Sequence, residues 1–135
     1  MLKYHPKHDR MWDAWIVSHT NQFHLFHLQT RISDGEADPR GWGHAVSTDL
    51  LRWQELSPVM PPTGTEGDSL YRYTGCTVAE NDRFFTFSTR RNGRGDQSIG
   101  LSLSDDLFNW TDCMDSVLTP DPALFLASPL PGWSN

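Results

Sequence analysis

Apolar residues in this chain occur in short runs that are separated by clusters of glycine, proline, asparagine and aspartate. Short apolar runs bounded by such turn residues are typical of β-strands, and signals for amphipathic helices are almost absent. The pattern therefore predicts eight strands in two groups of four. The first group covers residues 11–17, 23–30, 42–47 and 54–60, and the second covers residues 73–78, 84–89, 98–104 and 111–118.

A seven-residue motif occurs once in each group. Residues 47–53 (STDLLRW) and 104–110 (SDDLFNW) both fit S-x-D-L-x-x-W, and an aromatic run precedes each copy. A repeat of this period indicates two equivalent structural units. Asp49 and Asp106 recur at the same place in the two turns, which predicts that they are structural and bind nearby backbone amides.

Several of the predicted strands are apolar on both faces. In the second strand, Phe23 and Leu25 lie on one side, and Phe26 and Leu28 lie on the other. Such a strand needs a sheet that is covered on both faces, as in the stacked four-stranded antiparallel blades of a β-propeller. A β-sandwich would leave one face of each sheet exposed to solvent. The sequence thus predicts an all-β propeller with two blades.

The predicted domain is a partial propeller over residues 1–135. Blade one covers about residues 11–60, blade two about residues 73–118, and a tail over residues 119–135 leads to a third blade. Closed propellers have roughly four to eight blades. We therefore expect the open blade faces to be covered by the remaining blades of a longer chain or by self-association.

Composition narrows the function. The formal charge is −6 and the eleven Lys and Arg residues are scattered, which argues against nucleic-acid binding. No apolar run reaches the roughly 18 residues of a membrane-spanning helix, so we expect no membrane partner. The first ten residues lack the apolar segment of a signal peptide, which predicts a cytoplasmic protein.

Other candidate sites are weak. Two cysteines make neither a disulfide framework nor a metal site, and we expect no metal or organic cofactor. His24 and His27 point to opposite faces of one strand, so we expect packing roles. Arg90, Arg91 and Arg94 are expected in a solvated loop, although a site for an anionic group is the alternative.

Asp13 is the first candidate for chemistry. It lies between Trp12 and Trp15 in the opening strand, and the first strands of propeller blades line the central channel. Indole rings can stack on a sugar while the carboxylate attacks it or activates water. The equivalent position in the second unit is Thr74, so the fold does not require a carboxylate there; a structural hydrogen bond is the alternative. Trp42 could line a saccharide-binding subsite, or it could fill the space between the blades.

The motifs together resemble the first two blades of the five-bladed propeller glycosidases of glycoside hydrolase family 32, the β-fructosidases, and of the related families 43 and 68. The resemblance is carried by Trp12-Asp13 and by residues 23–29 (FHLFHLQ), 42–47 (WGHAVS), 49–53 (DLLRW) and 73–75 (YTG). It implies that Asp13 is the nucleophile, or the base if the enzyme inverts. It also implies substrate contacts from Trp12, Gln29, Trp42, His44, Tyr73 and Thr74.

The chain departs from the family pattern in two ways. The family surrounds the nucleophile with W-M-N-D-P-N-G, whereas residues 11–15 read MWDAW. The family also needs an aspartate in an R-D-P segment and a later acid/base glutamate, and neither is present here. Since glycoside hydrolysis ordinarily takes two carboxylates, we expect this piece alone to be inactive.

The predicted function is that of a parent glycoside hydrolase, acting on an O-glycosidic bond of a fructoside with carbohydrate as its partner. Two alternatives remain at this point. One is a non-catalytic propeller that binds carbohydrate, and the other is an interaction propeller that binds no sugar.

Overall fold

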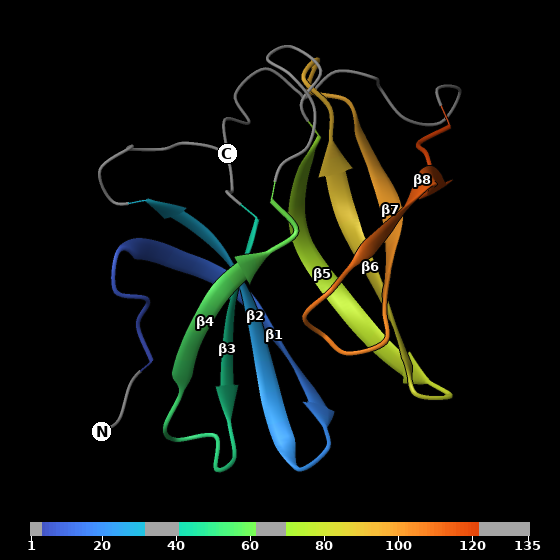
Figure 1. Cartoon of the computed structure of the whole chain (residues 1–135). Helices are drawn as coiled ribbons and strands as arrows, with labels where there is room; N and C mark the ends of the chain where they lie inside the picture. The colour runs from blue at the N-terminus through green and yellow to red at the C-terminus, as the bar shows by residue number, and fades with distance from the viewer. Residues whose placement is uncertain (1–3, 32–40, 62–69, 122–135) are drawn as a thin grey trace.

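The computed structural model describes residues 4–31, 41–61 and 70–121, and in these it contains eight strands and no helix (Figure 1). None of these residues belongs to a helix long and apolar enough to cross a membrane. The strands form two four-stranded antiparallel sheets, each a simple meander in chain order. The first sheet has β1 (Asp9–His19), β2 (Gln22–Arg31), β3 (Trp42–Ser47) and β4 (Gln54–Val59); the second has β5 (Tyr71–Glu80), β6 (Arg83–Arg91), β7 (Gln97–Ser104) and β8 (Thr111–Leu118).

Both sheets repeat the same irregularity in their first strand. The register of β1 against β2 shifts between Met11 and Ala14, and that of β5 against β6 shifts between Arg72 and Gly75. In each case two residues of the first strand oppose one residue of the second, which is a β-bulge. The internal repeat therefore includes backbone geometry that the motif spacing alone does not reveal.

The S-x-D-L-x-x-W turns have the predicted structural role. Asp49 Oδ1 accepts the backbone N–H groups of Leu51 and Arg52 at 2.8 Å, and Asp106 Oδ1 does the same for Phe108 and Asn109 at 2.8 and 2.7 Å. In each turn, the leucine after the aspartate has a positive φ, 62° and 66°. The aspartate stabilises this turn because it satisfies amides that no strand partner reaches.

The two sheets pack against each other through an aromatic core. Phe26 and Trp42 are fully buried on one face of the first sheet. The ring of Trp110 meets both of them edge-on, with centroids 5.8 and 6.0 Å away. Hydrogen bonds between described residues also cross the interface: Trp15 Nε1 donates to Thr77 Oγ1 at 3.0 Å, and Trp42 Nε1 donates to the Tyr73 carbonyl at 3.1 Å. The stacked arrangement of successive blades is therefore present, with β1 and β5 adjacent across the interface (Figure 1).

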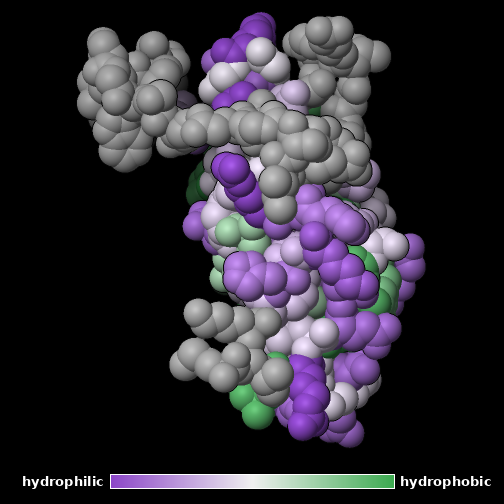
Figure 2. Space-filling view, turned by 90° about the vertical axis from the view of Figure 1, so that its left-hand side faces the viewer, coloured by the Kyte–Doolittle hydropathy of each residue, from purple (hydrophilic) through white to green (hydrophobic). Residues whose placement is uncertain are grey.

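The outer faces of the two sheets differ. On the first sheet, His27 and Ala45 are buried, and Tyr4 covers His27 with ring centroids 5.7 Å apart. The side of the molecule at the left of Figure 1 is mostly hydrophilic, with small hydrophobic patches (Figure 2). On the second sheet, Phe87 and Val78 remain 39% and 51% exposed. The expected open apolar face thus exists on β5–β8.

Candidate functional site

Asp13 and Thr74 form a pair between the two sheets. The Thr74 hydroxyl donates to Asp13 Oδ2 at 2.5 Å, and both residues are exposed to solvent. The two residues occupy equivalent positions of β1 and β5, which are adjacent strands. The structure therefore brings together two of the residues that the sequence singled out from opposite halves of the chain.

The paired bulges explain this meeting. Trp12 and Asp13 together oppose one residue of β2, and Tyr73 and Thr74 together oppose one residue of β6. A bulge adds local twist and redirects a side chain that regular alternation would place on one sheet face. Because both first strands have the bulge at the same level, the redirected carboxylate and hydroxyl meet at hydrogen-bonding distance.

Aromatic side chains flank the pair in the sequence. Trp12 is 41% exposed. Tyr73 is half-buried against the aromatic core, where its carbonyl accepts the Trp42 indole N–H. Trp12, which precedes Asp13, and Tyr73, which precedes Thr74, thus both leave part of their surface open to solvent.

Three other predicted site residues are buried. Trp42, His44 and Gln29 are 0%, 1% and 4% exposed. Trp42 lies between the sheets, and His44 stacks on Phe26 with centroids 4.6 Å apart. These three side chains present almost no surface to solvent.

The histidines of the first sheet pack as predicted. His24 and His27 are buried on opposite faces of β2, and His24 Nδ1 lies 3.0 Å from His44 Nε2 in a hydrogen bond. Burial, followed by the charges of His24 and His27, lowers the pKa of His44 to about 4; burial also lowers the pKa of His24. Both rings are therefore neutral near pH 7. Among the described residues, no group of three or more His, Cys, Asp or Glu side chains is placed to hold a metal.

The expectation of a solvated loop for Arg90 and Arg91 was wrong. Both belong to β6, and Arg90 is only 3% exposed. Its guanidinium donates to Asp112 Oδ1 at 3.1 Å and to the carbonyls of Leu101 and Cys113 at 2.7 and 2.8 Å. Strand alternation points Arg90 into the sheet interface, and the compensating carboxylate comes from β8, which sequence spacing does not reveal.

The contact of Arg91 with two tyrosine rings is a feature that the sequence did not predict. It lies opposite Tyr71 in the β5–β6 register, with its guanidinium carbon 5.6 Å from the Tyr71 ring and 5.8 Å from the Tyr73 ring. Cation–π contact of this kind orients both rings. Alternating tyrosines at 71 and 73 were the available signal.

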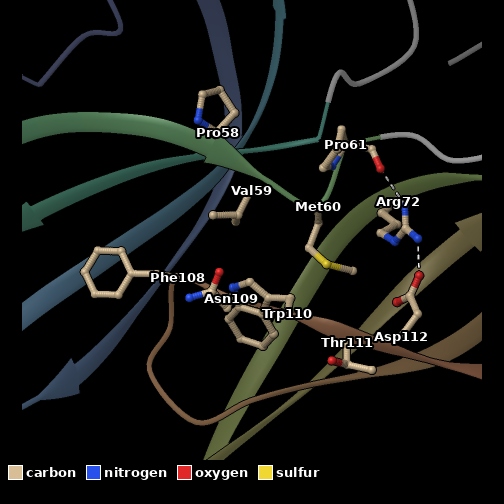
Figure 3. Close-up of a pocket in the computed structure, with 10 residues that line it drawn as sticks. All are labelled: Pro58, Val59, Met60, Pro61, Arg72, Phe108, Asn109, Trp110, Thr111 and Asp112. Carbon is tan, nitrogen blue, oxygen red and sulfur yellow. Dashed lines mark hydrogen bonds and ion pairs between the residues drawn. The ribbon is translucent and has the colours of Figure 1, made fainter.

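A separate cleft of about 670 Å³ lies between the outer strands β4 and β8 (Figure 3). Met60 and Trp110 line it, and at its edge Arg72 reaches Asp112 and the Pro61 carbonyl. None of the residues predicted for the site lines this cleft. This cleft therefore lies apart from the residues that the sequence predicts for the site.

Comparison of the sequence with known proteins identifies relatives in one enzyme family. Residues 6–125 match the model described as the glycosyl hydrolases family 32 N-terminal domain. A fructan beta-fructosidase of Streptococcus mutans is 31% identical over 110 residues, which is 70% of this chain and 7% of that protein. A bifunctional 6(G)-fructosyltransferase/2,1-fructan:2,1-fructan 1-fructosyltransferase of Allium cepa is 32% identical over 108 residues, 70% of this chain and 17% of that protein.

The fold comparison agrees. The structure of a Bombyx mori GH32 beta-fructofuranosidase superposes with a TM-score of 0.71 at 22% identity, covering 87% of this chain and 25% of that one. The prediction of an all-β propeller architecture is thereby confirmed. The chain spans a quarter or less of the length of each of these three proteins. A match over residues 6–125 covers most of the sequence, and we conclude that this chain belongs to glycosyl hydrolase family 32.

Proposed function

We propose that the polypeptide containing this chain hydrolyses the O-glycosidic bond of a fructoside, with Asp13 as nucleophile. The observation that carries this proposal is the exposed Asp13 carboxylate, held at a bulge of the first strand beside the neighbouring blade. Membership of a glycosyl hydrolase family and the fructan-acting relatives support the class of bond and sugar.

The chemistry follows from two carboxyl groups. A free oxygen of Asp13 attacks the anomeric carbon, and the glycosidic C–O bond breaks as the leaving oxygen takes a proton from a second carboxylic acid. Water then cleaves the glycosyl ester and returns a proton to that second group. No other residue of this chain matches the family's acid/base, so the 135 residues alone are expected to be inactive.

In this proposal the sugar stacks on the exposed ring of Trp12 and on the half-buried ring of Tyr73. The buried Trp42 fixes the Tyr73 backbone through its indole N–H. His44 packs on Phe26 inside the first sheet. The protein is proposed to act in the cytoplasm, and cell fractionation with an antibody against residues of this chain tests that location.

The test is Asp13→Asn in the longest natural polypeptide that contains this chain, assayed on sucrose, inulin, levan and an aryl fructoside. Loss of a nucleophile lowers kcat by about 10³-fold or more. The matched control is Asp105→Asn, because Asp105 is an exposed aspartate that forms an ion pair with the exposed Arg83. Wild-type turnover in the Asp13→Asn variant would exclude the nucleophile assignment.

A second candidate function is carbohydrate binding without hydrolysis. The departure of residues 11–15 from the family pattern around Asp13 favours it. Under this alternative, wild-type polypeptide shows no turnover, but fructo-oligosaccharides change its tryptophan fluorescence with saturation. If no sugar changes the fluorescence, an interaction propeller is indicated.

A further inference from the structure

Within the described residues, the Asp13 carboxylate has one hydrogen-bond partner, and that partner comes from the other sheet. The Thr74 hydroxyl lies 2.5 Å from Asp13 Oδ2. A separation this short is typical of a hydroxyl that donates to an ionised carboxylate. Oδ2 is thus engaged, while Oδ1 accepts no hydrogen bond from the described residues.

The backbone before Thr74 is firmly anchored. Arg72 is 2% exposed and forms an ion pair with Asp112, and its guanidinium also donates to the Pro61 carbonyl at 2.9 Å. The next residue, Tyr73, has its carbonyl held by Trp42 Nε1 at 3.1 Å. The two positions that precede Thr74 are therefore fixed by buried groups.

The backbone after Thr74 is equally constrained. A Cβ atom on Gly75 would lie 3.0 Å from the Thr86 methyl and 3.1 Å from the Trp15 ring. The strand therefore approaches its neighbours closely at this point. With both flanks fixed, the Thr74 hydroxyl has little freedom except rotation of its own side chain.

We propose that Thr74 is a positioning residue for the nucleophile: its hydroxyl fixes the Asp13 carboxylate so that Oδ1 is the oxygen that attacks. This inference rests on the proposed function and assigns Thr74 a role toward Asp13 in place of a sugar contact. Productive attack requires a defined approach of the reacting atoms, and loss of orientation slows the chemical step with little effect on substrate binding.

The test compares Thr74→Val, which keeps the shape without the hydroxyl, with Thr74→Ser, which keeps the hydroxyl, in the full polypeptide. Thr74→Val should lower kcat for an aryl fructoside by about 10- to 100-fold and change KM by no more than about threefold. Thr74→Ser should stay within about threefold of wild type in both constants.

The matched control is Thr77→Val. Thr77 lies on the same strand and also takes part in a hydrogen bond between the sheets, from Trp15, but does not touch Asp13. It should leave kcat close to wild type. A rise in KM with unchanged kcat in Thr74→Val would overturn the proposal in favour of a sugar contact, and equal damage from Thr74→Ser would overturn it in favour of a packing role.

A crystallographic readout separates this inference from the proposed function. If the wild-type polypeptide hydrolyses none of the substrates, the proposed function fails. The side-chain conformation of Asp13 in the crystal structures then decides by itself whether Thr74 positions this carboxylate. Asp13 should hold one side-chain conformation in wild type and Thr74→Ser and more than one in Thr74→Val. One unchanged conformation in all three overturns the positioning role.

Discussion

At the scale of single residues, the buried histidine pair makes folding depend on pH. His24 and His44 are hydrogen-bonded to each other, and the ring of Phe108 lies over both, 5.4 and 5.2 Å away. Burial lowers the pKa of each ring below the value of about 6.5 expected in the unfolded chain. The pair therefore favours folding only while it is neutral.

This arrangement predicts acid sensitivity. Above pH 6.5 the His44 ring is neutral in both the folded and the unfolded chain. As pH falls from 6.5 to about 4, the unfolded state takes up this proton first, so the folded state loses stability. His44 can contribute a loss of up to about 1.4 kcal/mol per pH unit in this range, and His24 acts in the same direction. Thermal melts of the polypeptide between pH 7.5 and 4 should show a falling Tm, and His44→Gln should flatten the slope. An equal slope in His44→Gln would contradict the assignment.

At the scale of the elements, one buried ionic network joins all four strands of the second sheet. Asp112 on β8 accepts hydrogen bonds from Arg72 on β5, Arg90 on β6 and Ser102 on β7. Burial raises the pKa of the Asp112 carboxyl, but hydrogen bonds from Arg72 and Ser102 and the arginine charges outweigh burial and lower the pKa. The sheet depends on this carboxylate because it compensates two buried guanidinium groups.

Removal of that charge should destabilise the sheet strongly. Asp112→Asn removes the carboxylate that forms ion pairs with the buried Arg72 and Arg90, and breaking a buried ion pair costs about 3–5 kcal/mol. The exposed pair of Arg83 and Asp105 is the control, and Asp105→Asn should cost less than about 1 kcal/mol. Denaturant unfolding of the two variants measures the difference, and equal midpoints would show that the network contributes nothing.

At the scale of the whole molecule, the second sheet has an apolar face without a neighbour in the described structure. Phe87 and Val78 on this face are 39% and 51% exposed. In the β5–β6 register, Phe87 lies opposite Cys76 and Val78 lies opposite Phe85. The longer relatives have a further part of the chain that is available to cover such a face. Among the described residues of this chain, nothing covers it. Exposed apolar surface of this kind favours association.

We therefore expect residues 1–135 expressed alone to self-associate through the β5–β8 face. Sedimentation should give a species larger than the 15.4 kDa monomer, and the double variant Val78→Glu with Phe87→Glu should move it towards the monomer. Leu51→Glu is the control, because Leu51 is 62% exposed but lies in a turn of the first sheet. A wild-type chain that stays monomeric at high concentration would rule out this association.

Some features of this protein follow from the sequence by itself. Short apolar runs and turn residues predict eight strands, and the repeated S-x-D-L-x-x-W turns predict two equivalent units, because hydrogen bonds in these turns are local. The resemblance of the motifs leads to the family, and Asp13 stands out because its counterpart, Thr74, is not acidic. These signals all lie within a few residues of one another or repeat along the chain.

Other features were decided only by the tertiary structure. The bulges, the meeting of Asp13 with Thr74 and the pairing of Arg90 with Asp112 depend on strand register and on how two sheets stack. Burial of Trp42 and His44 depends on the second sheet, whose side chains cover a face that the sequence left open to either a ligand or a blade. Contacts between residues far apart in the chain have no local pattern, so the sequence alone does not reveal them.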